Sequence, residues 1–167
     1  MTKSIIVTIL ITTGLIGLMW WGRGLQRPVA SAGAQSSSAK SDLTASEKIY
    51  DFGTISMKNG VVTKDFKITN STNKDIFVPS LVTSCMCTKA FIVETDGTTK
   101  GPFGMPGMGY VPPSNETIKA GEARIIRVEY DPNAHGPAGV GSIDRFITLT
   151  DDSGGVLQLE IKAVVTP

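Results

Sequence analysis

The sequence predicts an all-β protein, an antiparallel β-sandwich preceded by one N-terminal transmembrane helix. Short segments in which apolar and polar residues alternate recur from Glu47 onward. The chain has 18 Gly and 9 Pro in 167 residues and only 19% charged residues, a composition typical of loop-rich β proteins. One long uncharged apolar run precedes these segments. The length allows one domain with appendages.

The apolar run, residues 4–22, consists mainly of Ile, Leu, Val and Met and ends at Trp20 and Trp21. At about 1.5 Å per residue it is long enough to cross the hydrocarbon core of a bilayer. Arg23 and Arg27 come after it, so residues 1–27 are predicted to be an uncleaved membrane anchor. The alternative is a signal peptide, because residues 30–34 contain small-residue cleavage patterns. Either segment exports the remainder of the chain, so we expect a single-pass protein of the cell membrane with an extracytoplasmic C-terminal domain.

Two further parts are predicted after the anchor. Residues 28–46 are rich in Ala, Ser and Gly and have almost no large apolar side chains, which is typical of a flexible linker. Residues 47–167 form the β-sandwich domain. Its predicted strands are Ile49–Phe52, Val61–Thr69, Ile76–Val82, Lys89–Glu94, Arg124–Tyr130, Asp144–Thr150 and Val156–Val165.

The alternation within these strands also predicts which side chains form the core. Residues of one parity are apolar while their neighbours are polar, so one face of each strand should be buried. Pro79 interrupts the third strand and predicts an edge or a bulge there. The expected core residues are Phe66, Ile68, Ile126, Val128, Leu159 and Ile161.

Several short motifs occur in a characteristic order. They are DFGTI at residues 51–55, FKITN at 66–70, SCMCT at 84–88 and the turn KAGE at 119–122. In this order they resemble the bacterial DUF1573 family of Ig-like extracytoplasmic domains, over about Ile49 to Val165. Met86 and Ala120 stand where that family usually has Gly and Pro. The resemblance implies an Ig-like sandwich and a location outside the cytoplasm, but it implies no function.

The pair Cys85 and Cys87 is the main chemical feature of the sequence. Residues two apart in a strand point to the same face, so both thiols would be presented together. Three interpretations remain open: structural use, including a disulfide in an oxidising compartment; redox exchange; and soft-metal binding, because two thiolates suit Cu(I) or Zn(II).

Three other residues are candidate metal ligands. Met105 and Met108 lie in a Gly- and Pro-rich loop, and thioethers favour Cu(I). The alternative for both is a hydrophobic plug that covers one end of the sandwich. His135, the single histidine of the chain, lies in another turn-rich loop. It is either a ligand that folding brings to the cysteines or an exposed loop residue.

The sequence argues against several classes of function. From Asp42 onward the chain has 12 basic and 15 acidic side chains, a net charge of −3, and no basic cluster, which is unfavourable for nucleic-acid binding. Phosphate-binding, serine-nucleophile and zinc-protease motifs are missing from the sequence, so we do not expect an enzyme. Asp151 and Asp152 precede Ser-Gly-Gly and are best explained by a hairpin turn.

Two function classes are left. The first is a non-catalytic Ig-like module, tethered to the membrane, that binds a protein partner or supports an envelope structure. The alternative is a soft-metal protein, with Cu(I) as cofactor, or a thiol redox protein that uses the Cys-Met-Cys motif. Its metal ligands would come from Cys85, Cys87, Met105, Met108 and His135.

Overall fold

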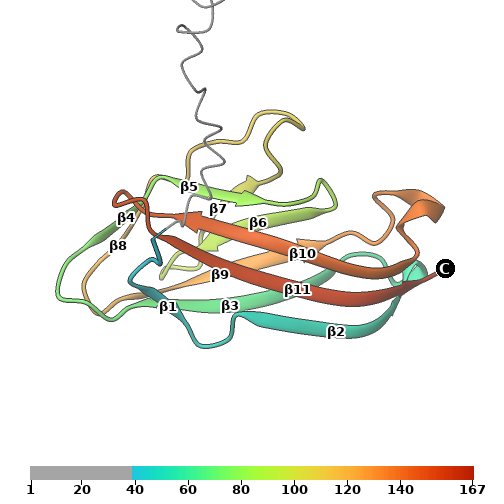
Figure 1. Cartoon of the computed structure of the whole chain (residues 1–167), viewed down its shortest axis with the longest axis horizontal. Helices are drawn as coiled ribbons and strands as arrows, with labels where there is room; N and C mark the ends of the chain where they lie inside the picture. Colours follow the sequence, from blue (N-terminus) through green and yellow to red (C-terminus); the bar gives the residue numbers. More distant parts are fainter. Residues whose placement is uncertain (1–38) are drawn as a thin grey trace, which may run out of the picture. The chain divides into compact units, whose positions relative to one another are not determined.

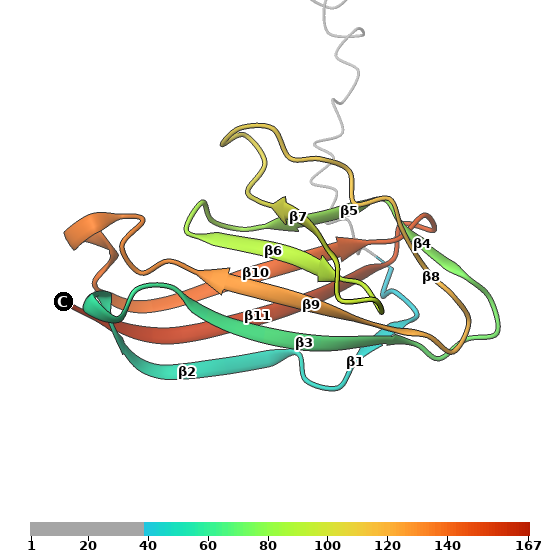
Figure 2. The same cartoon turned by 180° about the vertical axis from the view of Figure 1, so that it is seen from behind.

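A computed structural model describes residues 39–167 of the chain. This part folds into two facing sheets and a short two-stranded ribbon, seen from opposite sides in Figures 1 and 2. The strands are β1 Leu43–Ala45, β2 Ile49–Ser56, β3 Val62–Asn70, β4 Ile76–Val78, β5 Ser80–Thr83, β6 Thr88–Val93, β7 Thr99–Phe103, β8 Glu116–Ile118, β9 Ala123–Tyr130, β10 Gly141–Thr150 and β11 Val156–Thr166. Short 3-10 helices lie at Met57–Asn59 (η2) and Gly136–Gly139 (η3).

The two sheets form a sandwich, as predicted. One sheet has the order β1-β3-β9-β6-β7 and the other has the order β2-β11-β10-β5, while β4 and β8 pair as the ribbon. Most neighbouring strands are antiparallel, but β11 and β2 are parallel. The predicted antiparallel arrangement is therefore confirmed except at this pair. The two strands come from opposite ends of the domain, so no hairpin constrains their relative direction.

The core lies between the sheets and is made of the residues that alternation predicts. Phe66 and Ile68 on β3 are 1% and 0% exposed, and Phe66 is in register with Ile126 on β9. Leu159 and Ile161 on β11 face them from the other sheet and are fully buried. The predicted core residues are confirmed, because period-two burial is a direct consequence of strand geometry.

The folded domain begins before Glu47, so the predicted linker 28–46 is corrected for its last residues. Leu43 on β1 is 1% exposed and pairs with Asn70 on β3. Lys40 also forms a bridge with Val156. A single buried Leu among small polar residues has no periodic pattern, which explains why composition suggested a linker here.

The predicted anchor, residues 1–27, and the first part of the linker lie outside the described residues. Within residues 39–167, the structure contains no helix with the length and apolarity needed to cross a membrane.

Pro79 separates two strands that the sequence pattern predicts as one. The chain leaves β4 in the ribbon, passes Pro79 and enters β5 at the edge of the second sheet. β1, β7 and β8 were not predicted. β7 occupies part of the segment that was expected to be a loop, and its Phe103 is buried opposite Ala90 of β6. Gly101 permits this pairing, because its φ is +132° and a Cβ there would lie 3.0 Å from the Ala90 carbonyl oxygen.

The β5–β6 turn and the β9–β10 connection lie at the same end of the sandwich, where the C-terminus also lies (Figures 1 and 2). A backbone hydrogen bond joins them, because the Asp131 N–H donates to the Cys87 carbonyl oxygen at 2.9 Å. Both cysteines and the histidine of the chain therefore lie at this end of the domain.

Candidate thiol and metal site

Cys85 and Cys87 lie in the turn between β5 and β6 and are joined by a disulfide, with their Cα atoms 5.3 Å apart. The expectation that a strand presents both thiols is therefore wrong, because a tight turn brings them together. The Thr83 hydroxyl stabilises this turn by hydrogen bonding to the carbonyl oxygens of Cys85 at 3.1 Å and Thr88 at 3.0 Å. The Thr88 N–H closes the turn on the Cys85 carbonyl at 3.1 Å.

His135 approaches this turn from the β9–β10 connection. Its Nε2 atom lies 3.2 Å from Sγ of Cys85. Asp131 shapes the connection, since its side chain accepts a hydrogen bond from the Asn133 N–H at 2.8 Å. The two sulfur atoms and an imidazole nitrogen all lie within 4.8 Å of one another. Folding thus brings together three of the five candidate ligands, although His135 is 50 positions from Cys85.

Arg145 is a residue of this site that sequence reasoning missed. Its Nε atom donates to Sγ of Cys87 at 3.2 Å, and its Nη1 atom donates to the Asp144 carbonyl at 2.9 Å. Arg145 lies beside Cys87 because β5 pairs with β10. The two strands stay together beyond the end of β5, where the Phe146 N–H donates to the Ser84 hydroxyl at 2.9 Å. Arg145 occupies an ordinary position in an alternating strand, so no local signal marks it.

The positive charge of Arg145 also affects the phenol of Tyr130. Tyr130, the last residue of β9, is 1% exposed. Burial raises the pKa of its phenol above the ordinary value, while the positive charge of Arg145 acts in the opposite direction and Asp131 adds to the increase. Burial thus outweighs the effect of Arg145 on this phenol.

Met105 and Met108 belong to a neighbouring cavity. They line a cavity of about 160 Å³ together with Met86 and Tyr110, and neither cysteine is among the residues that line it. A second cavity, of about 180 Å³, lies beside Cys87 and is also lined by Met86. Met105 and Met108 therefore share a cavity with Met86, and Met86 also lines the cavity beside Cys87.

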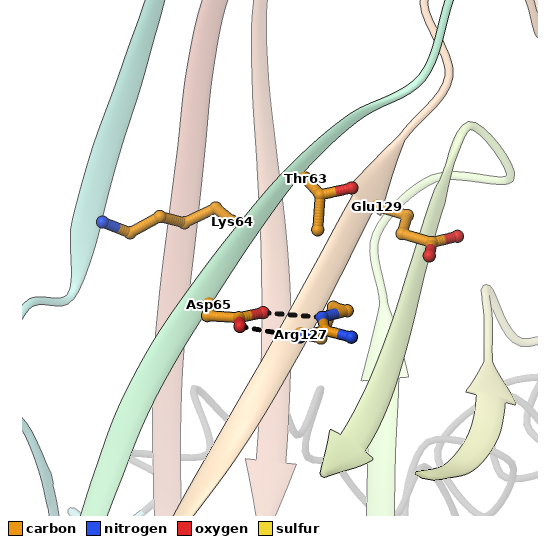
Figure 3. A pocket seen from close by; sticks show the side chains of 5 residues that line it. All are labelled: Thr63, Lys64, Asp65, Arg127 and Glu129. Atoms are coloured by element: carbon orange, nitrogen blue, oxygen red, sulfur yellow. Dashed lines mark hydrogen bonds and ion pairs between the residues drawn. The ribbon is translucent and has the colours of Figure 1, made fainter. Parts of the chain in front are cut away.

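The outer face of β3 and β9 carries a hollow of about 530 Å³ that is unrelated to the cysteines. Figure 3 shows Asp65 and Arg127 facing each other there, while Lys64 points to the other side of β3. Arg127 donates two hydrogen bonds of 2.9 Å to the Asp65 carboxylate. The arginine hydrogen bond and charge lower the pKa of Asp65 despite partial burial. The charges of Asp65 and Arg127 are therefore paired with each other.

Fold and site together define an all-β sandwich domain with a cysteine–histidine cluster at one end. Residues 43–100 match the profile of the family described as "Protein of unknown function (DUF1573)", so the resemblance to DUF1573 is confirmed for this part of the chain. The matched range includes Cys85 and Cys87. It does not include His135 or Arg145.

Solved structures show the same architecture. A protein of unknown function from Porphyromonas gingivalis W83 aligns with a TM-score of 0.54 at 15% identity, over 80% of this chain and 51% of that one. A family 123 glycoside hydrolase from Clostridium perfringens aligns with a TM-score of 0.50 at 6% identity, over 71% of this chain and 22% of that one. This chain thus spans about half the length of the first structure, and both likenesses concern the fold alone. No curated protein matches the chain.

Proposed function

We propose that this protein is a membrane-tethered, extracytoplasmic β-sandwich module that binds Cu(I) through Cys85, Cys87 and His135. The observation that carries this proposal is the convergence of three donor atoms within 4.8 Å. Two sulfurs and one imidazole nitrogen are soft or borderline ligands, which suit Cu(I) far better than Mg²⁺ or Ca²⁺. The proposal describes a binding protein and includes no hydrolytic or transfer chemistry.

Binding of this kind requires the reduced protein. The disulfide must first open, because thiolates are the species that ligate a metal. Three hydrogen bonds of the turn, two from the Thr83 hydroxyl and one from the Thr88 N–H, end on carbonyl oxygens and so do not depend on the S–S bond. His135 is preferred as third ligand over Met105 and Met108, because its Nε2 atom lies 3.2 Å from Sγ of Cys85, whereas the two methionines line a cavity that neither cysteine lines.

The direct test is Cu(I) competition against a coloured chelator, with the reduced full chain kept free of oxygen. We expect about one Cu(I) per chain with sub-micromolar affinity, lost in the Cys85→Ser/Cys87→Ser double variant. His135→Asn should weaken binding about tenfold or more, whereas Met108→Leu should leave it unchanged. Equal weak binding by the wild type and the double variant would refute the proposal.

The membrane location is proposed from the apolar run and the basic residues Arg23 and Arg27. The full chain should remain with membranes after a high-salt wash, and added protease should reach its C-terminal domain from the extracytoplasmic side. A soluble product that begins near Gly33 or Gln35 would instead identify residues 1–27 as a cleaved signal peptide.

A second candidate function is interaction with another protein. It is favoured by large apolar side chains that remain in solvent around one cavity: Met86 is 46% exposed, Met108 is 58% exposed and Tyr110 is 86% exposed. A photo-crosslinking residue at position 110 should give one discrete adduct in cells, and Met108→Ser should reduce its yield. A diffuse set of adducts that Met108→Ser does not change would argue against this function.

A further inference from the structure

The two ends of the Cys85–Cys87 disulfide differ in exposure and in charge. Cys87 is 2% exposed, and Arg145 donates to its sulfur at 3.2 Å. Cys85 is only partly buried, and its sulfur lies beside the exposed ring of His135. Cys85 is therefore the more exposed of the two residues, whereas Cys87 is buried with a positive charge at its sulfur.

We propose that this disulfide undergoes thiol–disulfide exchange with an external thiol, with Cys85 as the attacked sulfur and Cys87 as the leaving group. This activity uses the residues of the proposed Cu(I) site, but it belongs to the oxidised protein and involves no metal. The reacting partner is any accessible cysteine thiol, whether it belongs to a small molecule or to a protein.

The exchange balances with two external thiols. The first thiolate attacks Sγ of Cys85, a new S–S bond forms, the Cys85–Cys87 bond breaks, and its electron pair leaves on Cys87 as a thiolate. A second external thiolate then attacks the external sulfur of the mixed disulfide and releases Cys85. The protein gains two electrons and becomes a dithiol, while the two external thiols are oxidised to one disulfide.

Arg145 favours this direction of bond cleavage. Negative charge develops on the leaving sulfur as the S–S bond breaks, and a guanidinium N–H at hydrogen-bonding distance stabilises that charge. The hydrogen bond from Nη1 to the Asp144 carbonyl holds the guanidinium in place before the reaction starts. Other charged residues near Cys87 are Lys89, Glu129 and Asp131, which line the adjacent cavity, but none of them donates to the sulfur.

The cavity beside Cys87 gives a means of distinguishing the source of the thiol. It has a volume of about 180 Å³, and its apolar lining comes from Val61, Met86 and Ala134. In a peptide, apolar residues that flank the reacting cysteine can contact this lining. Glutathione has no apolar side chain that could do so. The rate constants of exchange, each divided by the thiolate concentration, are compared for the peptide and for glutathione. A higher rate constant for the peptide indicates a protein thiol, and equal rate constants indicate a small thiol.

The experiment treats the oxidised full chain with glutathione at constant pH, quenches early with an alkylating agent and locates both labels by mass spectrometry. We expect glutathione on Cys85 and the alkyl group on Cys87. Arg145→Gln should slow formation of the mixed disulfide about tenfold, because a charged hydrogen bond to the leaving group is lost. Arg145→Lys should restore most of the rate. Arg127→Gln, which removes an arginine from the outer face of β9, should leave the rate unchanged.

Glutathione found mainly on Cys87, or an Arg145→Gln rate equal to that of the wild type, would overturn the proposal. The labelling pattern of the wild type needs no variant, so the test survives if Arg145→Gln does not fold. Exchange by the oxidised protein together with absence of Cu(I) binding by the reduced protein would support this inference and refute the metal proposal. The reverse result would refute this inference alone.

Discussion

The Ser41 hydroxyl donates a hydrogen bond to Oδ2 of Asp151 at 2.6 Å, across 110 positions of the sequence. Both residues are buried, at 4% and 6% exposure. Asp151 also accepts hydrogen bonds from the Ser153 hydroxyl at 2.6 Å and the Gly155 N–H at 2.7 Å. The carboxylate therefore organises the β10–β11 turn and at the same time fastens the segment before β1 to it.

Replacing Ser41 with Ala should destabilise the protein by about 1–2 kcal/mol. The substitution leaves a buried carboxylate oxygen without one of its donors. Urea unfolding of the full chain measures the loss. Ser46→Ala is the matched control, since the Ser46 hydroxyl is exposed and makes only a 3.5 Å contact with the Lys67 carbonyl, and its effect should stay under about 0.5 kcal/mol. Equal effects of the two variants would contradict the role of Ser41.

The contribution of Asp151 should depend on pH. Burial alone would raise the pKa of this carboxyl, but hydrogen bonds from Ser153, Ser41 and the Gly155 N–H outweigh it and lower the pKa below its ordinary value of 3.8. A carboxyl whose pKa is lowered by folding stabilises the folded state above the ordinary value and loses this contribution as pH falls below it. The stability gap between the wild type and Asp151→Asn should therefore be largest near pH 7 and shrink below about pH 4. A gap that stays constant between pH 7 and pH 3 would contradict this linkage.

Glu116 is the centre of a buried ion cluster, and its removal should be costly. Its side chain is 4% exposed, and it accepts a hydrogen bond from Nε of Arg124 at 2.8 Å and another from Lys100. Burial opposes ionisation of Glu116, but the hydrogen bonds from these two cations prevail and lower its pKa. Glu116→Ala should cost about 2–3 kcal/mol, because Arg124 loses its shortest carboxylate contact and keeps only Glu122 at 3.1 Å and Glu94 at 3.4 Å.

The matched control for this cluster is Asp65→Ala, an exposed carboxylate on the outer face of β3. Asp65 and Arg127 are 45% and 40% exposed, so solvent screens their ion pair and its loss should change stability little. Thermal and urea unfolding should therefore rank the two variants clearly. A loss of similar size in both would show that the buried cluster contributes little.

Phe66→Ala should destabilise the sandwich by about 3–5 kcal/mol, since it opens a cavity between the sheets at a residue 1% exposed. Lys67, its neighbour on β3, points to the outer face, and Lys67→Ala should change the free energy of unfolding by less than about 0.5 kcal/mol. Chemical denaturation of both variants provides the comparison. A Phe66→Ala protein as stable as Lys67→Ala would contradict the placement of this ring in the core.

The fragment 47–167 should be less stable than the fragment 39–167. The shorter fragment lacks β1, so it loses the buried Leu43 and leaves the edge of β3 unpaired. Loss of a buried leucine alone costs about 2–5 kcal/mol. Thermal unfolding of the two fragments measures the difference, and the shorter one should also associate more readily through its open edge. Identical melting temperatures would show that residues 39–46 do not contribute to the stability of the domain and behave as part of the linker.

Much of the fold is determined by local patterns. In β3, β9 and β11 apolar residues alternate with polar ones, and alternation alone predicts that Phe66, Ile126 and Leu159 are buried, as they are. β1 and β8 have three residues each, too few to establish a period, so the sequence does not reveal them. The parallel direction of β2 against β11 is likewise invisible, because it depends on contacts between the two ends of the domain.

The candidate site likewise has some residues that the sequence reveals and others that only the fold brings together. Cys85 and Cys87 are only two positions apart, so their motif can be recognised in the sequence. The chemistry of thiols identifies them as soft ligands. The partners of these thiols are a consequence of strand pairing. His135 reaches Cys85 across 50 positions through the β9–β10 connection, and Arg145 reaches Cys87 across 58 positions because β10 lies beside β5. Alternation and motif chemistry are properties of neighbouring residues, whereas the asymmetry of the disulfide arises from contacts between distant ones, which exist only once the two sheets have formed.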